Sequence, residues 1–270
     1  MTTFFKVDDL ELTDERFFLI AGPCVIEEEG LTREIAAEAK KICLELGIPF
    51  IFKASFDKAN RSSIHSPRGP GIAEGLPILD KIKTGLNVPV LSDIHEPWQA
   101  ETAAHVLSII QIPAFLSRQT DLLLAAARTD LPLNIKKSQL MSPDDMFLAV
   151  KKTADVGNRR VMLTERGTFF GYNNLVVDFR SIPRMKESGC PVVMDATHAV
   201  QRPSGAGEIS GGDPQFIPML AAAGIAAGAD GIFLEIHPHP EKALSDGTNS
   251  LPLSDLRPLL IRLQKLYNVR

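Results

Sequence analysis

The sequence is poor in cysteine and in aromatic residues, and it has no long apolar run. There are three cysteines, one tryptophan and two tyrosines among 270 residues. An odd number of cysteines without disulfide spacing predicts free thiols and a reducing compartment. No apolar run approaches the roughly 20 residues that span a bilayer, so we expect no membrane partner. The opening stretch MTTFFKVDDLELTDE lacks a basic segment followed by an apolar one, which argues against a signal peptide and favours the cytoplasm.

An excess of basic charge is also missing. The net charge is −4 and the isoelectric point is about 5.9, which argues against a broad basic face for nucleic acid. Basic residues that bind a ligand should therefore be clustered locally. Hydrophobic residues make up 44% of the chain, which is enough for a large core. Because no linker rich in proline or serine interrupts the sequence, we expect a single domain over residues 1–270.

Short apolar runs alternate with helix-like segments along the whole chain. Most of these runs are continuously apolar, as in strands covered on both faces. Residues 31–42 have helical periodicity, and this helix is predicted to end near Gly47. The eight apolar runs span residues 17–26, 49–55, 88–94, 108–113, 133–137, 160–164, 191–196 and 231–236.

Eight such repeats predict an α/β fold, a single (β/α)8 TIM barrel. An open, doubly wound sheet is the alternative, but the first strand is not followed by a G-x-G-x-x-G turn. Residues 1–15 are predicted to form a short N-terminal β-hairpin that closes the bottom of the barrel. Two long loops follow the late strands, over residues 199–214 and 237–252. Long flexible loops at this end of a barrel usually cover a site.

Four basic residues follow strands two, five and six, where the active site of a barrel should lie. A lysine buried at a strand end is costly without an anionic partner, although each one alone could simply form an ion pair. Their convergence predicts a multiply charged substrate such as a phosphorylated carboxylate. Residues 53–63 add hydroxyl and amide donors that suit a phosphate, with a solvated loop as the alternative. The four cations are Lys53, Lys58, Lys136 and Arg166.

A possible metal site lies at the ends of strands one, seven and eight, which are neighbours in a closed barrel. Its candidate ligands suit a divalent transition ion such as Zn²⁺, Fe²⁺, Mn²⁺ or Co²⁺. Cys24 could instead be a small buried apolar residue. His237 and His239 are rival ligands, but their flanking prolines favour packing or exposure. The candidate set is Cys24, His198, Glu235 and Asp246.

Together these residues lie in motifs that resemble those of the 3-deoxy-D-manno-octulosonate 8-phosphate synthases, in order and over nearly the whole chain. The resemblance implies a TIM barrel, usually tetrameric, that condenses phosphoenolpyruvate with D-arabinose 5-phosphate and water. The products would be the octulosonate 8-phosphate, for lipopolysaccharide or a related polysaccharide, and inorganic phosphate. The motifs are AGPCVIE (21–27), FKASFDKANRSSIHS (52–66), RGPG (68–71), LSDIHE (91–96), QIPAFLSRQTDL (111–122), NIKKSQ (134–139), ERG (165–167), GYNNLVVDFR (171–180), MDATHAVQ (194–201), GGDPQF (211–216), LEIHP (234–238) and SDGTNSLPL (245–253).

The resemblance also implies roles for individual residues. The four cations would bind phosphoenolpyruvate with Gln111 nearby, and Arg118 would reach the sugar phosphate of a neighbouring subunit. Cys24 would place the chain in the metal-dependent branch of the family, because the metal-free branch has asparagine there. The implied contacts to arabinose 5-phosphate are Asn60, Arg61, Ser62 and Asp93, and the implied catalytic set is Lys53, Lys58, Asn60, Asp93, His198 and Asp246.

Two other functions compete with this interpretation. The related 3-deoxy-D-arabino-heptulosonate 7-phosphate synthases use erythrose 4-phosphate and typically carry a Lys-Pro-Arg-Thr motif. This chain has Lys-Ala-Asn-Arg-Ser at 58–62, which favours the five-carbon sugar. A barrel that binds sugar phosphates without catalysis should have lost a cation or a metal ligand, and none of those expected is missing.

Overall fold

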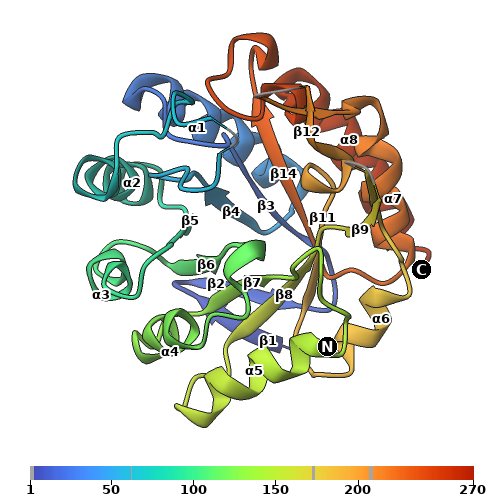
Figure 1. Cartoon of the computed structure of the whole chain (residues 1–270). Helices are drawn as coiled ribbons and strands as arrows, with labels where there is room; N and C mark the ends of the chain where they lie inside the picture. The colour runs from blue at the N-terminus through green and yellow to red at the C-terminus, as the bar shows by residue number, and fades with distance from the viewer. Residues whose placement is uncertain (1–2, 62, 172–173, 207–208) are drawn as a thin grey trace.

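The computed structural model describes residues 3–61, 63–171, 174–206 and 209–270, and its centre is a ring of parallel strands (Figure 1). The last ring strand pairs with both the first and the one before it, which closes the ring. Closure confirms the predicted barrel and excludes the open sheet. In chain order the ring strands are β3 (Phe18–Gly22), β4 (Phe50–Lys53), β5 (Val90–Asp93), β6 (Ile109–Ile112), β7 (Leu133–Lys136), β8 (Val161–Glu165), β11 (Val192–Asp195) and β14 (Gly231–His237).

A helix follows each ring strand before the next one begins, or before the chain ends. The first is α1 (Glu29–Leu46), which buries Ile35, Ala39 and Ile42 on one face and ends at Gly47 with φ of 66°. Within the described parts of the chain, no helix is long and apolar enough to cross a bilayer. The others are α2 (Ile72–Leu86), α3 (Gln99–Ala104), α4 (Thr120–Arg128), α5 (Asp145–Asp155), α6 (Ser181–Lys186), α7 (Ile217–Ala226) and α8 (Leu253–Tyr267).

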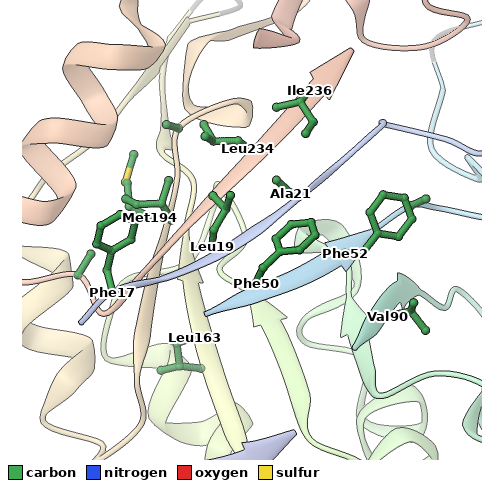
Figure 2. Packing of buried hydrophobic residues seen from close by; sticks show 14 of the residues in the cluster. Phe17, Leu19, Ala21, Phe50, Phe52, Val90, Leu163, Met194, Leu234 and Ile236 are labelled. Carbon is green, nitrogen blue, oxygen red and sulfur yellow. The ribbon is translucent and has the colours of Figure 1, made fainter. Parts of the chain in front are cut away.

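Apolar side chains fill two layers, one on each side of the ring. On β3, Leu19 and Ala21 belong to the layer between strands and helices, shown in Figure 2. Phe18 and Ile20 belong to a second cluster made by residues from around the ring. Because successive side chains of a strand point to opposite faces, both faces of β3 need apolar residues. This double burial explains why the strand sequences are continuously apolar.

The N-terminal hairpin covers the end of the barrel at which the strands begin. Its strands are β1 (Thr3–Val7) and β2 (Leu10–Thr13), paired antiparallel. Val7 and Leu12 are fully buried in the inner cluster, beside Phe18 and Ile109 at the starts of β3 and β6. The predicted hairpin is therefore confirmed, and the opposite end of the barrel is left for polar residues.

The prediction of a long loop over residues 199–214 is wrong in part. The chain there forms an antiparallel hairpin, β12 (Gln201–Ala206) and β13 (Ile209–Gly212). A second unpredicted hairpin, β9 (Thr168–Gly171) and β10 (Asn174–Val176), follows β8. These short strands form through backbone hydrogen bonds, so their sequences need no apolar alternation. Short elements η2 (His198–Val200), η3 (Pro214–Phe216), η4 (Pro240–Lys242), η5 (Gly247–Asn249) and β15 (Leu251–Pro252) lie between β11 and α8, and η1 (Ala114–Leu116) follows β6.

Candidate active site

The carboxyl ends of β3 and β4 approach each other closely because residue 22 is glycine. A Cβ atom on Gly22 would lie 1.9 Å from the carbonyl oxygen of Lys53, so no side chain fits there. Just beyond this contact, Lys53 Nζ donates a hydrogen bond to the carbonyl oxygen of Cys24 at 2.7 Å. The close approach therefore brings a predicted substrate cation and a predicted metal ligand to one point of the barrel rim.

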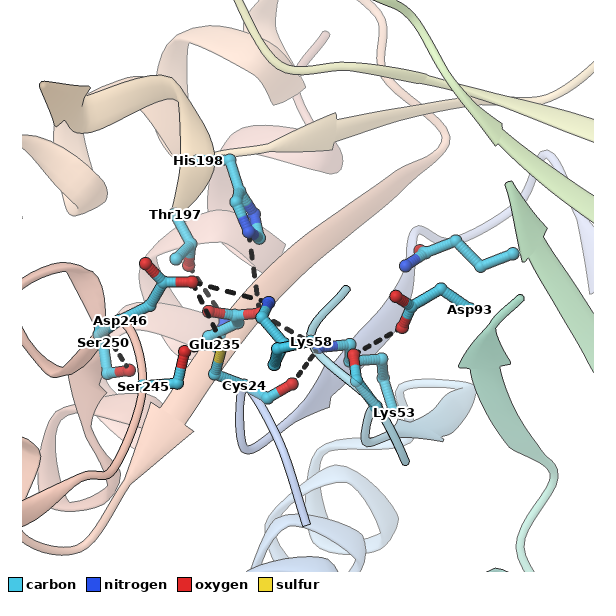
Figure 3. Close-up of polar contacts among 12 residues, drawn as sticks. Cys24, Lys53, Lys58, Asp93, Thr197, His198, Glu235, Ser245, Asp246 and Ser250 are labelled. Carbon is cyan, nitrogen blue, oxygen red and sulfur yellow. Dashed lines mark hydrogen bonds and ion pairs between the residues drawn. The ribbon is translucent and has the colours of Figure 1, made fainter. Parts of the chain in front are cut away.

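Three of the four predicted metal ligands gather at this point, as Figure 3 shows. Cys24, Glu235 and Asp246 each offer a ligand atom, and these atoms all lie within 4.8 Å of one another. Cys24 Sγ is 3.1 Å from Asp246 Oδ2 and 3.3 Å from the hydroxyl oxygen of Ser245. The sulfur and the carboxylates come from opposite ends of the sequence and meet because β14 pairs with β3.

The fourth predicted ligand, His198, lies beside this group rather than within it. Its Nδ1 is 2.8 Å from Asp195 Oδ2, and its Nε2 is 3.6 Å from Glu235 Oε1. Asp195 also accepts a hydrogen bond from the backbone N–H of His198. This carboxylate holds the ring so that the second nitrogen faces the other ligands, an arrangement common around metal-binding histidines.

The chemistry of the group fits a divalent ion. Glu235 Oε2 is buried and has no hydrogen-bond partner among the described residues. Burial raises the pKa of the Cys24 thiol well above its usual range, and the nearby Asp246 and Glu235 raise it further. A cation would satisfy the free oxygen and favour the thiolate over the thiol.

The rival ligands His237 and His239 lie elsewhere. His237 is buried, with Nε2 3.7 Å from Glu27 Oε1, and its Nδ1 accepts the backbone N–H of His239. The side chain of His239 is 62% exposed. These positions confirm that one histidine packs and the other is exposed.

Each predicted lysine of the site has a carboxylate close by. Lys53 Nζ lies 3.0 Å from Glu235 Oε1, and Lys58 Nζ lies 3.5 Å from Asp246 Oδ2. Lys136 Nζ lies 2.7 Å from Asp195 Oδ2 and 3.7 Å from the ring centroid of Phe233. Burial lowers the pKa of Lys136, although Asp195 opposes that effect. The lysines thus form ion pairs, and the same network surrounds the metal-ligand group.

Arg166 differs from the lysines because part of its guanidinium is unpaired. The residue is buried just after β8, and its Nη2 donates to Gln201 Oε1 at 2.7 Å. Its Nη1 is buried and has no hydrogen-bond partner in the described chain. A buried N–H group of a cation without a partner is costly, so this atom marks a place for an anion.

The residues predicted for the sugar phosphate are less closely gathered. Asp93 lies at the end of β5, where Oδ1 accepts the Ser55 hydroxyl and Oδ2 is 3.0 Å from His95 Nε2. Burial alone would raise the pKa of Asp93, but the bond to His95 holds it well below its usual range. Asn60 is exposed, and Arg61 Nη1 lies near the carbonyl oxygen of Lys58. Ser62 lies outside the described residues.

Two further predicted residues lie apart from the metal-ligand group. Gln111 on β6 is buried and accepts a hydrogen bond from Asn134 Nδ2 at 2.9 Å, which continues to Thr164. Arg118 is exposed in the connection between η1 and α4. The exposure of Arg118 suits the predicted reach toward a second subunit.

Three residues support the site although the sequence had assigned them no role in it. Asp195 ends β11 three residues before His198, and the sequence predicts it at a strand end but does not indicate its contacts with Lys136 and His198. Gln201 ends the motif MDATHAVQ (194–201), but it also lies in the segment interpreted as a loop, and the sequence assigned it no contact. Lys137 is fully buried, and its Nζ contacts Thr168 Oγ1 at 3.0 Å and Glu165 Oε1 at 3.5 Å. These contacts join the carboxyl end of β7, where Lys136 lies, to the end of β8 and the segment that follows it, which begins with Arg166.

Replacing Lys137 with methionine is expected to destabilise the fold by roughly 3 kcal/mol, because it leaves part of a buried carboxylate without its cation. The midpoint and slope of urea unfolding would measure this. Lys151→Met is the matched control, since its pair with Asp155 is exposed and should contribute little. Equal stability of the two variants would contradict the role of Lys137 in joining these segments.

Known proteins resemble this chain over nearly its whole length. The model of the DAHP synthetase I family matches residues 8–269. The 2-dehydro-3-deoxyphosphooctonate aldolase of Trichlorobacter lovleyi is 57% identical over 267 residues, which cover 98% of each protein. The protein of that name from Syntrophobacter fumaroxidans is 51% identical over 265 residues, 98% of this chain and 92% of the relative. That name denotes the octulosonate 8-phosphate synthases, so the predicted resemblance is confirmed: the chain belongs to the DAHP synthetase I family and, within it, to the 2-dehydro-3-deoxyphosphooctonate aldolases.

Proposed function

We propose that this protein condenses phosphoenolpyruvate with D-arabinose 5-phosphate and water, giving 3-deoxy-D-manno-octulosonate 8-phosphate and inorganic phosphate. The observation that carries the proposal is the 57% identity, over 98% of each chain, to an enzyme named for this product. The name of the matching family refers to the heptulosonate synthases, but the relatives at 51–57% identity carry the octulosonate name. This favours the five-carbon sugar over erythrose 4-phosphate.

The cations of the site suit phosphoenolpyruvate, which carries a carboxylate and a phosphate. Lys53, Lys136 and Arg166 are buried at one end of the barrel, and Arg166 Nη1 lacks a partner among the described residues. We assign Lys58 and Gln111 to the same substrate. The second substrate is assigned to Asn60, Arg61, Ser62 and Asp93. Cations held in a buried site stabilise developing negative charge more strongly than cations in water do.

In the proposed reaction, C3 of phosphoenolpyruvate attacks the aldehyde carbon of the sugar, and the aldehyde oxygen takes up a proton. Water adds at C2, which gives a hemiketal phosphate and releases a proton. Cleavage of the C2–O bond then expels phosphate with the bonding electron pair, and the C2 hydroxyl loses its proton to give the 2-keto acid. Holding both substrates at one barrel end contributes much of the rate, because positioning replaces a bimolecular encounter.

We propose that one divalent transition ion, Zn²⁺, Fe²⁺, Mn²⁺ or Co²⁺, is bound by four residues. When bound, the ion would supply Lewis-acid activation of water or orientation of the aldehyde. Lys53 and Lys58 form ion pairs with the carboxylates of Glu235 and Asp246, so two positive charges lie beside the proposed ligands. Burial alone would raise the pKa of Glu235, but Lys53 and His198 keep it below its usual value. The proposed ligands are Cys24, His198, Glu235 and Asp246.

Substrate choice tests the proposal directly. With phosphoenolpyruvate saturating, kcat/KM is expected to be higher for arabinose 5-phosphate than for erythrose 4-phosphate, because the motif at 58–62 differs from that of the heptulosonate synthases. Phosphate release with each sugar measures both constants. Equal values, or a preference for the four-carbon sugar, would overturn the assignment, and the absence of turnover with either would favour a binding protein.

We further propose that the protein acts as a homotetramer in the cytoplasm, as one domain over residues 1–270, and serves lipopolysaccharide or a related polysaccharide. Arg118 is assigned to the sugar phosphate of a neighbouring subunit. Arg118→Ala is therefore expected to raise the KM for arabinose 5-phosphate more than that for phosphoenolpyruvate. Sedimentation at assay concentration is the companion measurement, and a fully active monomer would contradict this assembly.

A further inference from the structure

The side chain of Gln201 connects Arg166 to the metal-ligand group. Gln201 accepts a hydrogen bond from Arg166 Nη2 at 2.7 Å through Oε1, and its Nε2 donates to Asp246 Oδ1 at 3.2 Å. Arg166 can only donate and a carboxylate can only accept, so the bridging side chain must offer both functions. Glutamine does so with one planar amide, and this chemistry fixes which end faces which partner.

The backbone around Gln201 holds this bridge in place. Gln201 is the first residue of β12, opposite Gly212 at the end of β13. A Cβ atom on Gly212 would lie 1.5 Å from Asn249 Oδ1, so any larger residue there would displace the Asn249 side chain. Asn249 belongs to η5, which begins directly after Asp246. The base of the β12–β13 hairpin is thus packed against the segment that carries Asp246.

We propose that Gln201 is a positioning residue that couples anion binding at Arg166 to divalent-ion binding at Asp246. The inference deepens the proposed function and rests on it. Nη1 of Arg166 has no partner within the described part of the chain and is the donor left for the anion, while Nη2 is held by Gln201. The other oxygen of Asp246, Oδ2, faces Cys24 Sγ at 3.1 Å.

The bridge predicts the sign of the coupling. An anion on Nη1 restricts the guanidinium, and the restricted guanidinium holds the amide of Gln201. The amide in turn holds Asp246 with Oδ2 toward Cys24. The ligand side chains therefore lose less conformational entropy when the ion binds. Each ligand is therefore expected to lower the dissociation constant of the other. By thermodynamic linkage the dissociation constants of both ligands must fall by the same ratio, which is the coupling factor.

The test measures two affinities of the intact protein. Co²⁺ affinity is determined by competition with a chelator, with and without phosphoenolpyruvate, after correction for Co²⁺ bound by phosphoenolpyruvate itself. Phosphoenolpyruvate affinity is determined by calorimetry, with and without Co²⁺. In the wild type we expect each ligand to lower the dissociation constant of the other about fivefold or more.

Two variants isolate the bridge. Gln201→Leu removes both hydrogen bonds, whereas Gln201→Glu keeps the acceptor for Arg166 and loses the donor to Asp246. Both are expected to bring the coupling factor close to one. Arg202→Leu is the control, because it breaks the pair with Asp213 at 2.7 Å in the same hairpin and leaves the bridge intact. Its coupling factor should match that of the wild type.

Several outcomes would overturn the inference. One is independent binding of the two ligands in the wild type. Another is a coupling factor in Gln201→Leu equal to that of the wild type. A third is a loss of coupling in Arg202→Leu as large as that in Gln201→Leu. If one Gln201 variant does not fold, as judged by circular dichroism, the other and the wild-type factor decide. Failure of the wild type to bind phosphoenolpyruvate at all would overturn the proposed function too, whereas binding without coupling would overturn only the role of Gln201.

Discussion

Metal-free protein is expected to lose nearly all turnover of phosphoenolpyruvate with arabinose 5-phosphate, and added Mn²⁺, Co²⁺, Zn²⁺ or Fe²⁺ should restore it. The physical reason is the ligand group itself, in which the ligand atoms of Cys24, Glu235 and Asp246 lie within 4.8 Å. Without a cation, two carboxylates face each other and Glu235 Oε2 has no partner among the described residues. Phosphate release before and after chelation, with metal content determined by elemental analysis, measures this effect.

Substitution of Cys24 sharpens this prediction. Cys24→Asn should bind the ion more weakly but keep part of the activity, now less sensitive to chelator, because the family resemblance implies asparagine here in a metal-free branch. Cys24→Ala should lose most activity, since it removes the ligand without offering a hydrogen bond. Full turnover by wild-type protein that is verified to be metal-free would show that Cys24 is only a packing residue.

Arg166→Leu is expected to lower kcat by about 100- to 1,000-fold, the range found when a donor to developing charge is removed from an active site. The KM for phosphoenolpyruvate should rise as well, while that for arabinose 5-phosphate changes less. This split follows from Arg166 Nη1, which has no partner among the residues that the structure describes and is assigned to phosphoenolpyruvate. Steady-state kinetics with each substrate varied in turn would separate the effects.

The matched control is Arg180→Leu. Its side chain is 91% exposed, pairs with Asp178, and lies in the same connection between β8 and the next ring strand. We expect wild-type kinetics from it, because an exposed ion pair contributes little and is screened by solvent. A loss of less than tenfold in Arg166→Leu, or an equal loss in the control, would rule out Arg166 as a direct substrate contact.

The sequence by itself determined the barrel and the positions at which its polar residues would lie. Continuous apolar runs such as the one that became β3 specify strands buried on both faces, and a ring of parallel strands covered by helices is the arrangement that buries them all. Cys24, Lys53 and Glu235 could be predicted at one end for the same reason. Every parallel strand of the ring ends on that side.

Tertiary structure alone decided how these residues are paired. The contacts of Lys136 with Asp195, and of Gln201 with both Arg166 and Asp246, join residues that are distant along the chain or lie in a segment without periodicity. Such contacts depend on side-chain direction and on close approach, to the backbone of a neighbouring strand at Gly22 and to the Asn249 side chain at Gly212. Composition and spacing specify where a strand ends, but hydrogen bonds between strands and loops specify which atoms meet there.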